Sequence, residues 1–194
     1  MGADVNLAHS FGHLCLCHIG TPKAIVNRHN YICSALKDLI KTTIPGDGPI
    51  PANVLAVETV VGNRPNGDAL IADIVFNQQQ MRTIIDVVIV EPFNRHGVGR
   101  VETGSAVDAA EEKKRTQYNA VASQPGTMFV PFALDSNGYI GKAATAYLIR
   151  LKEANPAMGS RIKAFLQEVS HHLAKQTAIA SEAGRAAAIQ AVWN

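Results

Sequence analysis

The chain has 194 residues, of which 47% are hydrophobic and 18% charged, which excludes a disordered protein and favours a globular one. This length suffices for one domain with a full core and a helical appendix. The net charge of +2 permits nucleic-acid binding without requiring it, and no apolar run reaches the roughly 18 residues of a membrane span.

The cysteine content and the N-terminus both bear on the cellular compartment. The first residues have neither the basic flank nor the apolar segment of a secretory signal. The chain has three cysteines, an odd number, and two of them are Cys15 and Cys17. We therefore expect an intracellular, reducing compartment rather than a disulfide framework.

The first half of the chain predicts one helix followed by three strands. The helix is expected over Arg28–Thr43, with Asn27 as its N-cap, because apolar residues recur there at helical spacing. Runs typical of strands follow, separated by turn-rich segments. These runs are Asn53–Val61, Asp68–Phe76 and Thr83–Glu91.

The second half predicts a helix over Ser105–Ala122, a strand over Thr127–Leu134 and then helices. The helical pattern of residues 141–194 is interrupted at Pro156 and around Gly184. Three successive strands can form a meander, and the fourth can join through the helix by a right-handed crossover. We therefore predict an α/β fold, a mixed sheet flanked by helices.

The order α-β-β-β-α-β is also the core order of restriction-endonuclease-like proteins of the PD-(D/E)XK class, although order alone gives only an analogy. On this basis the chain divides into three parts. They are an N-terminal segment with cysteine and histidine (1–27), a restriction-endonuclease-like core (28–153) and a helical C-terminal extension (154–194).

Asp86 is the most unusual residue, because it lies within the otherwise apolar run Ile84–Val90. Such a run is typical of a central strand buried on both faces. A carboxylate there costs several kcal/mol unless it is paired or binds a metal. Two explanations are open: an arginine or backbone N–H groups satisfy Asp86, or it belongs to a functional site.

The predicted helix Ser105–Ala122 places charged residues on its apolar stripe. Lys114 is four residues from both Ala110 and Tyr118, and Glu111 precedes it by three. One interpretation is that Lys114 reaches past the helix edge into water. The other is that its ammonium lies beside Asp86.

A second carboxylate near Asp86 would complete a site for metal-assisted phosphodiester hydrolysis. Asp68 opens the preceding strand, but Asp73 competes with it, because the glutamine-rich turn leaves the strand register open. Mg²⁺ binds a few carboxylate oxygens together with water and substrate phosphate. Such an ion acidifies a bound water and stabilises the leaving oxygen, while a lysine supplies a compact positive charge.

Six blocks in order resemble the restriction-like endonuclease domain of non-LTR retrotransposon polyproteins, between about His13 and Arg150. Each block is a short motif of that family, although Asn66 and Gly67 lengthen the block from Arg64 to Asp68. The blocks are His13-x-x-x-Cys17 with Arg28-His29-Asn30, Glu58, Arg64 to Asp68, Asp86-Val87-Val88-Ile89-Val90 with Pro92, Glu111-x-x-Lys114-x-x-x-Tyr118, and Phe129-x-Pro131 with Gly138-x-x-Gly141-x-Ala143.

The resemblance implies an Mg²⁺- or Mn²⁺-dependent DNA endonuclease that nicks target DNA to prime reverse transcription. Asp68 and Asp86 would be the metal ligands, Lys114 the catalytic lysine and Glu58 an auxiliary acid, with Glu111 and Tyr118 as further catalytic residues. It also implies a nuclear location, duplex DNA as partner, element RNA bound through other modules, and no membrane. Val88 stands where the class name expects lysine.

Arginine residues and one histidine are candidates for contacts to DNA. Arg28 and His29 start the first predicted helix, whose N-terminus favours phosphate. Arg28 pairing with an acid such as Glu58, with His29 packing locally, is the alternative. Arg95 and Arg100 lie in the loop that leaves the Asp86 strand.

A zinc site is a further expectation of low weight. His13 and Cys17 would need partners such as Cys15, His18, His29 or Cys33 to form a closed four-ligand set. Buried free thiols are the simpler interpretation. Two rival functions stay open: a catalytically inactive or domesticated nucleic-acid-binding module, and an intracellular zinc-binding interaction domain.

Overall fold

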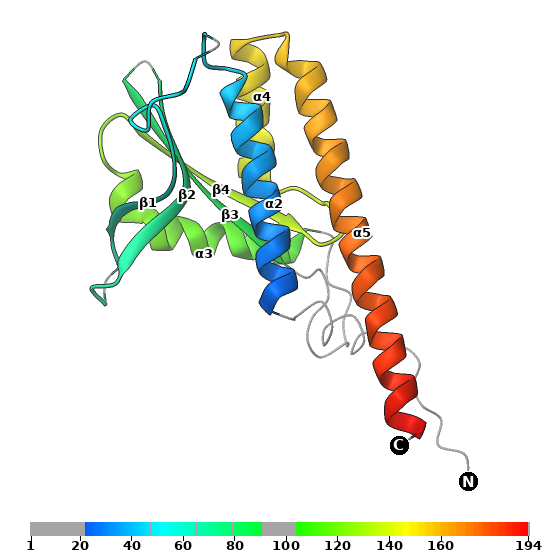
Figure 1. The fold of residues 1–194 in the computed structure, drawn as a ribbon. Coiled ribbons are helices and arrows are strands. Elements are labelled where there is room, and N and C mark those ends of the chain that lie inside the picture. Colours follow the sequence, from blue (N-terminus) through cyan, green and yellow to red (C-terminus); the bar gives the residue numbers. More distant parts are fainter. Residues whose placement is uncertain (1–21, 47, 65, 79, 91–103, 194) are drawn as a thin grey trace.

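The computed structural model describes residues 22–46, 48–64, 66–78, 80–90 and 104–193. A four-stranded mixed sheet lies between helices (Figure 1). The elements in chain order are α2 (Pro22–Lys41), β1 (Leu55–Asn63), β2 (Ala69–Gln78), β3 (Met81–Val90), α3 (Ser105–Ala122), β4 (Thr127–Asp135), α4 (Lys142–Ala154) and α5 (Met158–Trp193). This confirms the predicted order of helix, three strands, helix, strand and helices.

The two breaks predicted in the C-terminal helical region have different outcomes in the structure. The expected break at Pro156 is confirmed, since α4 ends at Ala154 and α5 begins at Met158. The expected break around Gly184 is wrong, because α5 continues through it. One glycine within a long helix costs only about 1 kcal/mol, which the rest of the helix can absorb.

The sheet has the strand order β1-β2-β3-β4. The first three strands form an antiparallel meander, and β4 pairs parallel to β3 after the α3 connection. Asp86 is level with Pro131 in this parallel pair. β4 is an edge strand, where a proline is tolerated because its missing N–H need not join a second ladder.

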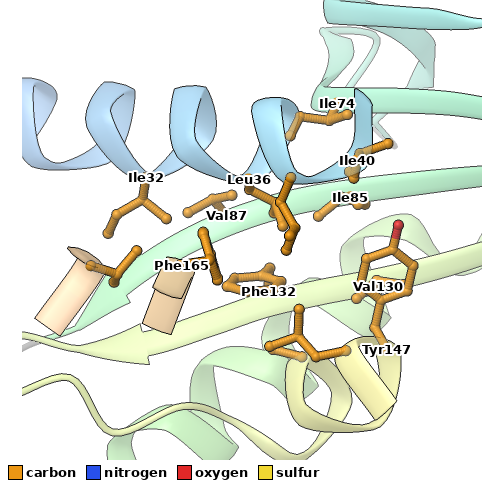
Figure 2. Close-up of a cluster of buried hydrophobic side chains, with 14 of the residues drawn as sticks. Ile32, Leu36, Ile40, Ile74, Ile85, Val87, Val130, Phe132, Tyr147 and Phe165 are labelled. Carbon is orange, nitrogen blue, oxygen red and sulfur yellow. The ribbon is translucent and has the colours of Figure 1, made fainter. Parts of the chain in front are cut away.

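One face of the sheet is covered by α2, α4 and α5. Ile32, Leu36 and Ile40 of α2 repeat at helical spacing and pack against the strands (Figure 2). Their neighbours include Val87 of β3 and Phe132 of β4, and Phe132 makes an edge-to-face contact with Phe165 of α5 at 6.2 Å between ring centroids. This face holds the larger part of the core.

The opposite face is covered by α3. Val121 and Tyr118 of α3 pack there against Leu70 and Ile84. Along β3, Ile84 belongs to this cluster, whereas Ile85 belongs to the cluster under α2. The strand is therefore buried on both faces as its apolar run predicted, and Asp86 follows the alternation toward α3.

The start of α2 differs from the prediction. The helix begins at Pro22, a residue type favoured at the first helical position, so Asn27 is not its N-cap. Arg28 lies more than a turn into the helix and is 4% exposed. The expectation that Arg28 and His29 form a phosphate site at a helix N-terminus is therefore wrong.

Arg28 instead belongs to the packing of α2 against α5. The pKa of His172 on α5 is lowered by burial, with smaller effects from the positive charges of Lys175 and Arg28. His172 also stacks on Tyr31 at 3.6 Å between ring centroids. Within the described ranges, no helix is both long enough and apolar enough to cross a membrane.

Candidate metal and catalytic site

The site lies where β2 and β3 separate. Their pairing begins at Gln78 with Met81 and ends at Ile74 with Ile85. Beyond this point, the backbone N–H of Val87 donates a hydrogen bond to Oδ2 of Asp73, at 2.6 Å, in place of a backbone carbonyl. Asp73 and Asp86 are thus the first residues past the last pair, and we call this place the fork.

Asp86 is 5% exposed and has a charged partner from α3. The Nζ of Lys114 lies 2.6 Å from its Oδ2. This confirms that Lys114 is directed to Asp86 and not past the helix edge. Burial raises the pKa of the Asp86 carboxyl, the contacts from Lys114 and Tyr118 oppose that rise, and the nearby charge of Asp73 adds to it.

Tyr118 holds the other oxygen of Asp86. Its hydroxyl lies 2.6 Å from Oδ1 of Asp86 and 2.6 Å from the carbonyl oxygen of Ile71. A hydroxyl has one proton and can donate to only one of the two acceptors at a time. The ring stacks on Phe129 at 4.4 Å, and burial followed by the Asp86 contact raises the pKa of Tyr118. Asp86 therefore lies beside Lys114, as one of the two interpretations of the sequence expected, and Tyr118, which the resemblance named as a further catalytic residue, lies with them.

We expect the buried carboxyl of Asp86 to make stability depend on pH. Its pKa is higher in the folded than in the unfolded state, so wild type should lose stability as pH rises from about 4, the ordinary aspartate pKa, through the raised value. Asp86→Asn removes this titration. Thermal melting at a series of pH values should give wild type and Asp86→Asn similar melting temperatures below pH about 4. Above that pH, the melting temperature of Asp86→Asn should exceed that of wild type by an increasing amount. A constant difference across this range would contradict the assignment.

Asp73 is the centre of a second group of polar side chains, on the α2 side of the fork. The Nε2 of His29 lies 3.3 Å from Oδ2 of Asp73 and 3.7 Å from Sγ of Cys33. The hydrogen bond to Asp73 is the main cause that raises the pKa of His29, to about 11. Burial raises the pKa of the Cys33 thiol, against the opposing contact from His29.

These side chains open into a pocket of about 160 Å³. Glu58 lines it beside Asp73, with His29, Cys33 and Lys37 of α2. The pairs that flank Glu58 on β1 place it level with Asp73 on β2, and its φ of 47° is in the left-handed region. Glu58, predicted as an auxiliary acid, is therefore on the Asp73 side of the fork.

Asp68 does not take part in the fork. It is exposed, lies just before β2, and its Oδ2 accepts a hydrogen bond from Nδ2 of Asn66 at 2.6 Å. Five strand residues, about 16 Å, separate it from Asp73. The geometry therefore contradicts Asp68 as the metal ligand that acts together with Asp86. It favours Asp73, the alternative that stayed open while the strand register was unknown.

Glu111 also differs from its predicted catalytic place. It is 2% exposed, its Oε1 accepts the backbone N–H of Ala143 at 2.9 Å, and Arg115 binds its Oε2 at 3.0 Å. Ala143 is in the first turn of α4, so the carboxylate caps that helix and complements its dipole. A side chain at Gly141 would collide with this carboxylate, which explains the glycine there.

We expect Glu111→Ala to lower the free energy of unfolding by about 2 kcal/mol, because the Ala143 N–H and the Arg115 guanidinium lose their partner. Urea denaturation measures the change. Glu112→Ala is the matched control: its carboxylate is exposed, and the change should stay within about 0.5 kcal/mol. Loss of activity in Glu111→Ala without loss of stability would mean that Glu111 has the predicted catalytic role.

A second, open pocket of about 590 Å³ was not predicted from the sequence. It is lined by Arg64, Asn66, Lys113, Thr116 and Gln117, a set without an acidic residue. Thr116 and Gln117 directly precede Tyr118 on α3, and the charge of Arg64 slightly lowers the pKa of Tyr118 against the larger effect of burial, so the pocket lies beside Tyr118. The sequence feature that could have indicated this pocket was the basic pair Lys113 and Lys114, of which only Lys114 faces the sheet.

Several predicted residues lie outside the described residues. They are Arg95, Arg100, Pro92, His13, Cys15, Cys17 and His18. Comparison with known proteins adds no assignment: no protein-family model matches the chain, and no curated protein matches it significantly. The fork is therefore the feature of the molecule from which a function can be inferred.

Proposed function

We propose that this chain is a metal-dependent DNA endonuclease with a PD-(D/E)XK-like core, which hydrolyses phosphodiester bonds to nick DNA. One observation carries the proposal: Asp73 and Asp86 flank the fork on adjacent strands, and the Lys114 ammonium lies 2.6 Å from Asp86. Two carboxylates and a lysine are the groups that this chemistry requires. The element order of the class supports it.

The donor set fits Mg²⁺ or Mn²⁺, which bind carboxylate oxygens and retain waters. Asp73 and Asp86 would hold the ion from the two sides of the gap between the strands, where the charge of Asp73 is near enough to raise the pKa of Asp86. Both carboxylates are oriented by neighbours, Asp73 by the Val87 N–H and Asp86 by the Tyr118 hydroxyl. A bound ion supplies an acidified water and neutralises charge on the phosphate. Lys114 then provides a compact positive charge beside the scissile phosphate, and Glu58 an acid at the pocket edge.

The open pocket lined by Arg64 and Lys113 supports DNA as the substrate. Its lining side chains are cationic or neutral hydrogen-bond donors, which suit phosphate oxygens. A strand crossing it would reach the fork near Tyr118. A role in target-primed reverse transcription, a nuclear location and element RNA bound through other modules are parts of the same proposal, supported by the sequence resemblance alone.

The direct test is nicking of supercoiled plasmid by the purified chain. Open circles should accumulate with Mg²⁺ or Mn²⁺ and not with excess EDTA, and Asp86→Asn prepared in parallel should be inactive. Equal nicking by both proteins would point to a contaminating nuclease and remove the support for the proposal.

A catalytically inactive DNA-binding module is the second candidate. The observation that favours it is that both oxygens of Asp86 are already engaged, one by Lys114 and one by Tyr118. DNA binding by wild type and Asp86→Asn alike, without cleavage under any divalent ion, would establish this candidate over the first.

A further inference from the structure

The His29, Cys33 and Asp73 side chains are a donor set of a different chemical kind from the paired carboxylates. We propose that they form a binding site for Zn²⁺, with the fourth position open to the pocket that Glu58 lines. Thiolate and imidazole donors are typical of zinc and not of Mg²⁺. This inference does not depend on the proposed nuclease activity.

Two of the three distances between donor atoms match those of a tetrahedral zinc ion. For ordinary zinc bond lengths, a nitrogen and a sulfur ligand lie about 3.6 Å apart, and a nitrogen and an oxygen about 3.4 Å apart. Here the His29 Nε2 is 3.7 Å from Cys33 Sγ and 3.3 Å from Asp73 Oδ2. One donor atom from each of the three residues lies within 4.8 Å of the others. A sulfur and an oxygen ligand of one zinc ion lie about 3.6 Å apart, so the Cys33 sulfur and the Asp73 carboxylate need to approach each other by at most about 1.2 Å.

The backbone already fixes these donors in place. His29 and Cys33 are one turn apart on α2, so their side chains lie on the same face of the helix. Asp73 is held by the Val87 N–H at 2.6 Å, a contact that orients its carboxylate. Three protein ligands thus come from two rigid elements, as a site with an exchangeable fourth ligand requires.

His29 has a hydrogen-bond acceptor beside its second ring nitrogen. Its Nδ1 lies 3.4 Å from Oδ1 of Asn30, which can accept the Nδ1–H and leave Nε2 for the metal. Zinc takes neutral imidazole and thiolate, so binding would release the second ring proton of His29 and the thiol proton of Cys33 to solvent. Binding should therefore tighten as pH rises.

Asp73 belongs both to this zinc site and to the proposed Mg²⁺ or Mn²⁺ site, so the two ions should exclude each other. Zn²⁺ held by His29, Cys33 and Asp73 would compete with any ion that needs the same carboxylate. If the proposed nuclease activity is present, micromolar Zn²⁺ should inhibit it, and Cys33→Ser should relieve that inhibition. This consequence alone depends on the proposed function.

The test uses Co²⁺ as a spectroscopic probe on the full chain with Cys15→Ser and Cys17→Ser, in which Cys33 is the only remaining thiol. One equivalent of Co²⁺ should give a thiolate-to-cobalt charge-transfer band, and Zn²⁺ should displace it. Adding Cys33→Ser should abolish the band. His29→Gln and Asp73→Asn should weaken Zn²⁺ binding by about 100-fold, and Ser34→Ala, which lines the same pocket, should not.

Two results would overturn the site. One is the absence of the band in the double serine variant, folded as judged by circular dichroism. The other is a cobalt charge-transfer band that is unchanged when Cys33→Ser is the only substitution. This second measurement is used if the variant with Cys15→Ser and Cys17→Ser fails to fold. Neither reading uses DNA, so failure of the zinc site and failure of the nuclease proposal are separate outcomes.

Discussion

Asp73→Asn is expected to abolish nicking, whereas Asp68→Asn should cut at the wild-type rate. Asparagine keeps the shape of the side chain and an oxygen for the Val87 N–H, but it removes the charge that a divalent ion requires. Metal catalysis supplies several kcal/mol, so its loss corresponds to a fall in rate on the order of 10³-fold or more. Single-turnover cleavage of a labelled duplex measures this rate.

Asp68 is the matched control because it carries the same charge just before the same strand, about 16 Å from the fork by strand rise. Its carboxylate contacts Asn66 in an exposed turn. Loss of cleavage in Asp68→Asn with full cleavage in Asp73→Asn would mean that the metal lies at the start of β2 and not at the fork. Equal melting temperatures would show that folding is not the cause.

Lys114→Ala is expected to lower turnover on the order of 10²-fold, because its ammonium is the positive charge beside Asp86 and would face the developing phosphorane. The variant should fold, since the Tyr118 hydroxyl still satisfies one oxygen of Asp86. The measurement is kcat at saturating DNA. Lys163→Ala on α5, exposed and on another element, is the control and should keep the wild-type kcat.

Lys113 separates binding from chemistry. It is adjacent to Lys114 but lines the open pocket with Arg64, so Lys113→Ala should raise KM and lower the salt dependence of DNA binding while kcat changes little. Equal losses of kcat in Lys113→Ala and Lys114→Ala would show that general affinity was being measured. The assignment of Lys114 to the chemistry would then be wrong.

The sequence predicted the order of elements, and it named the contact between Asp86 and Lys114 as one of two interpretations. Asp86 could be singled out because an unpartnered carboxylate in a buried strand is costly, and helical spacing put Lys114 on the stripe that faces the sheet. Both arguments use strong local periodicity. Neither depends on how distant segments are aligned.

What the sequence could not settle was alignment between segments. The choice between Asp68 and Asp73 required the β2–β3 register, because Asn77 and Gln78 look like turn residues but belong to β2. Glu111 lies on the predicted stripe of α3, yet its partner is the start of α4, thirty-two residues later. Arg28 was misplaced because the helix begins at Pro22 and not, as predicted, at Arg28.

The short hairpin between β2 and β3 determines how Asp73 and Asp86 are aligned across the two strands. β2 ends at Gln78 and β3 begins at Met81, a pair in direct register, so only two residues connect the strands. One residue more or fewer would slide β3 by one position and point Asp86 toward α2, where Ile85 and Val87 now pack. Related chains with this site should therefore keep the turn at two residues: a slip of one residue turns Asp86 to the other face of the sheet, and a slip of two residues keeps its face but moves it about 7 Å along the strand from Asp73.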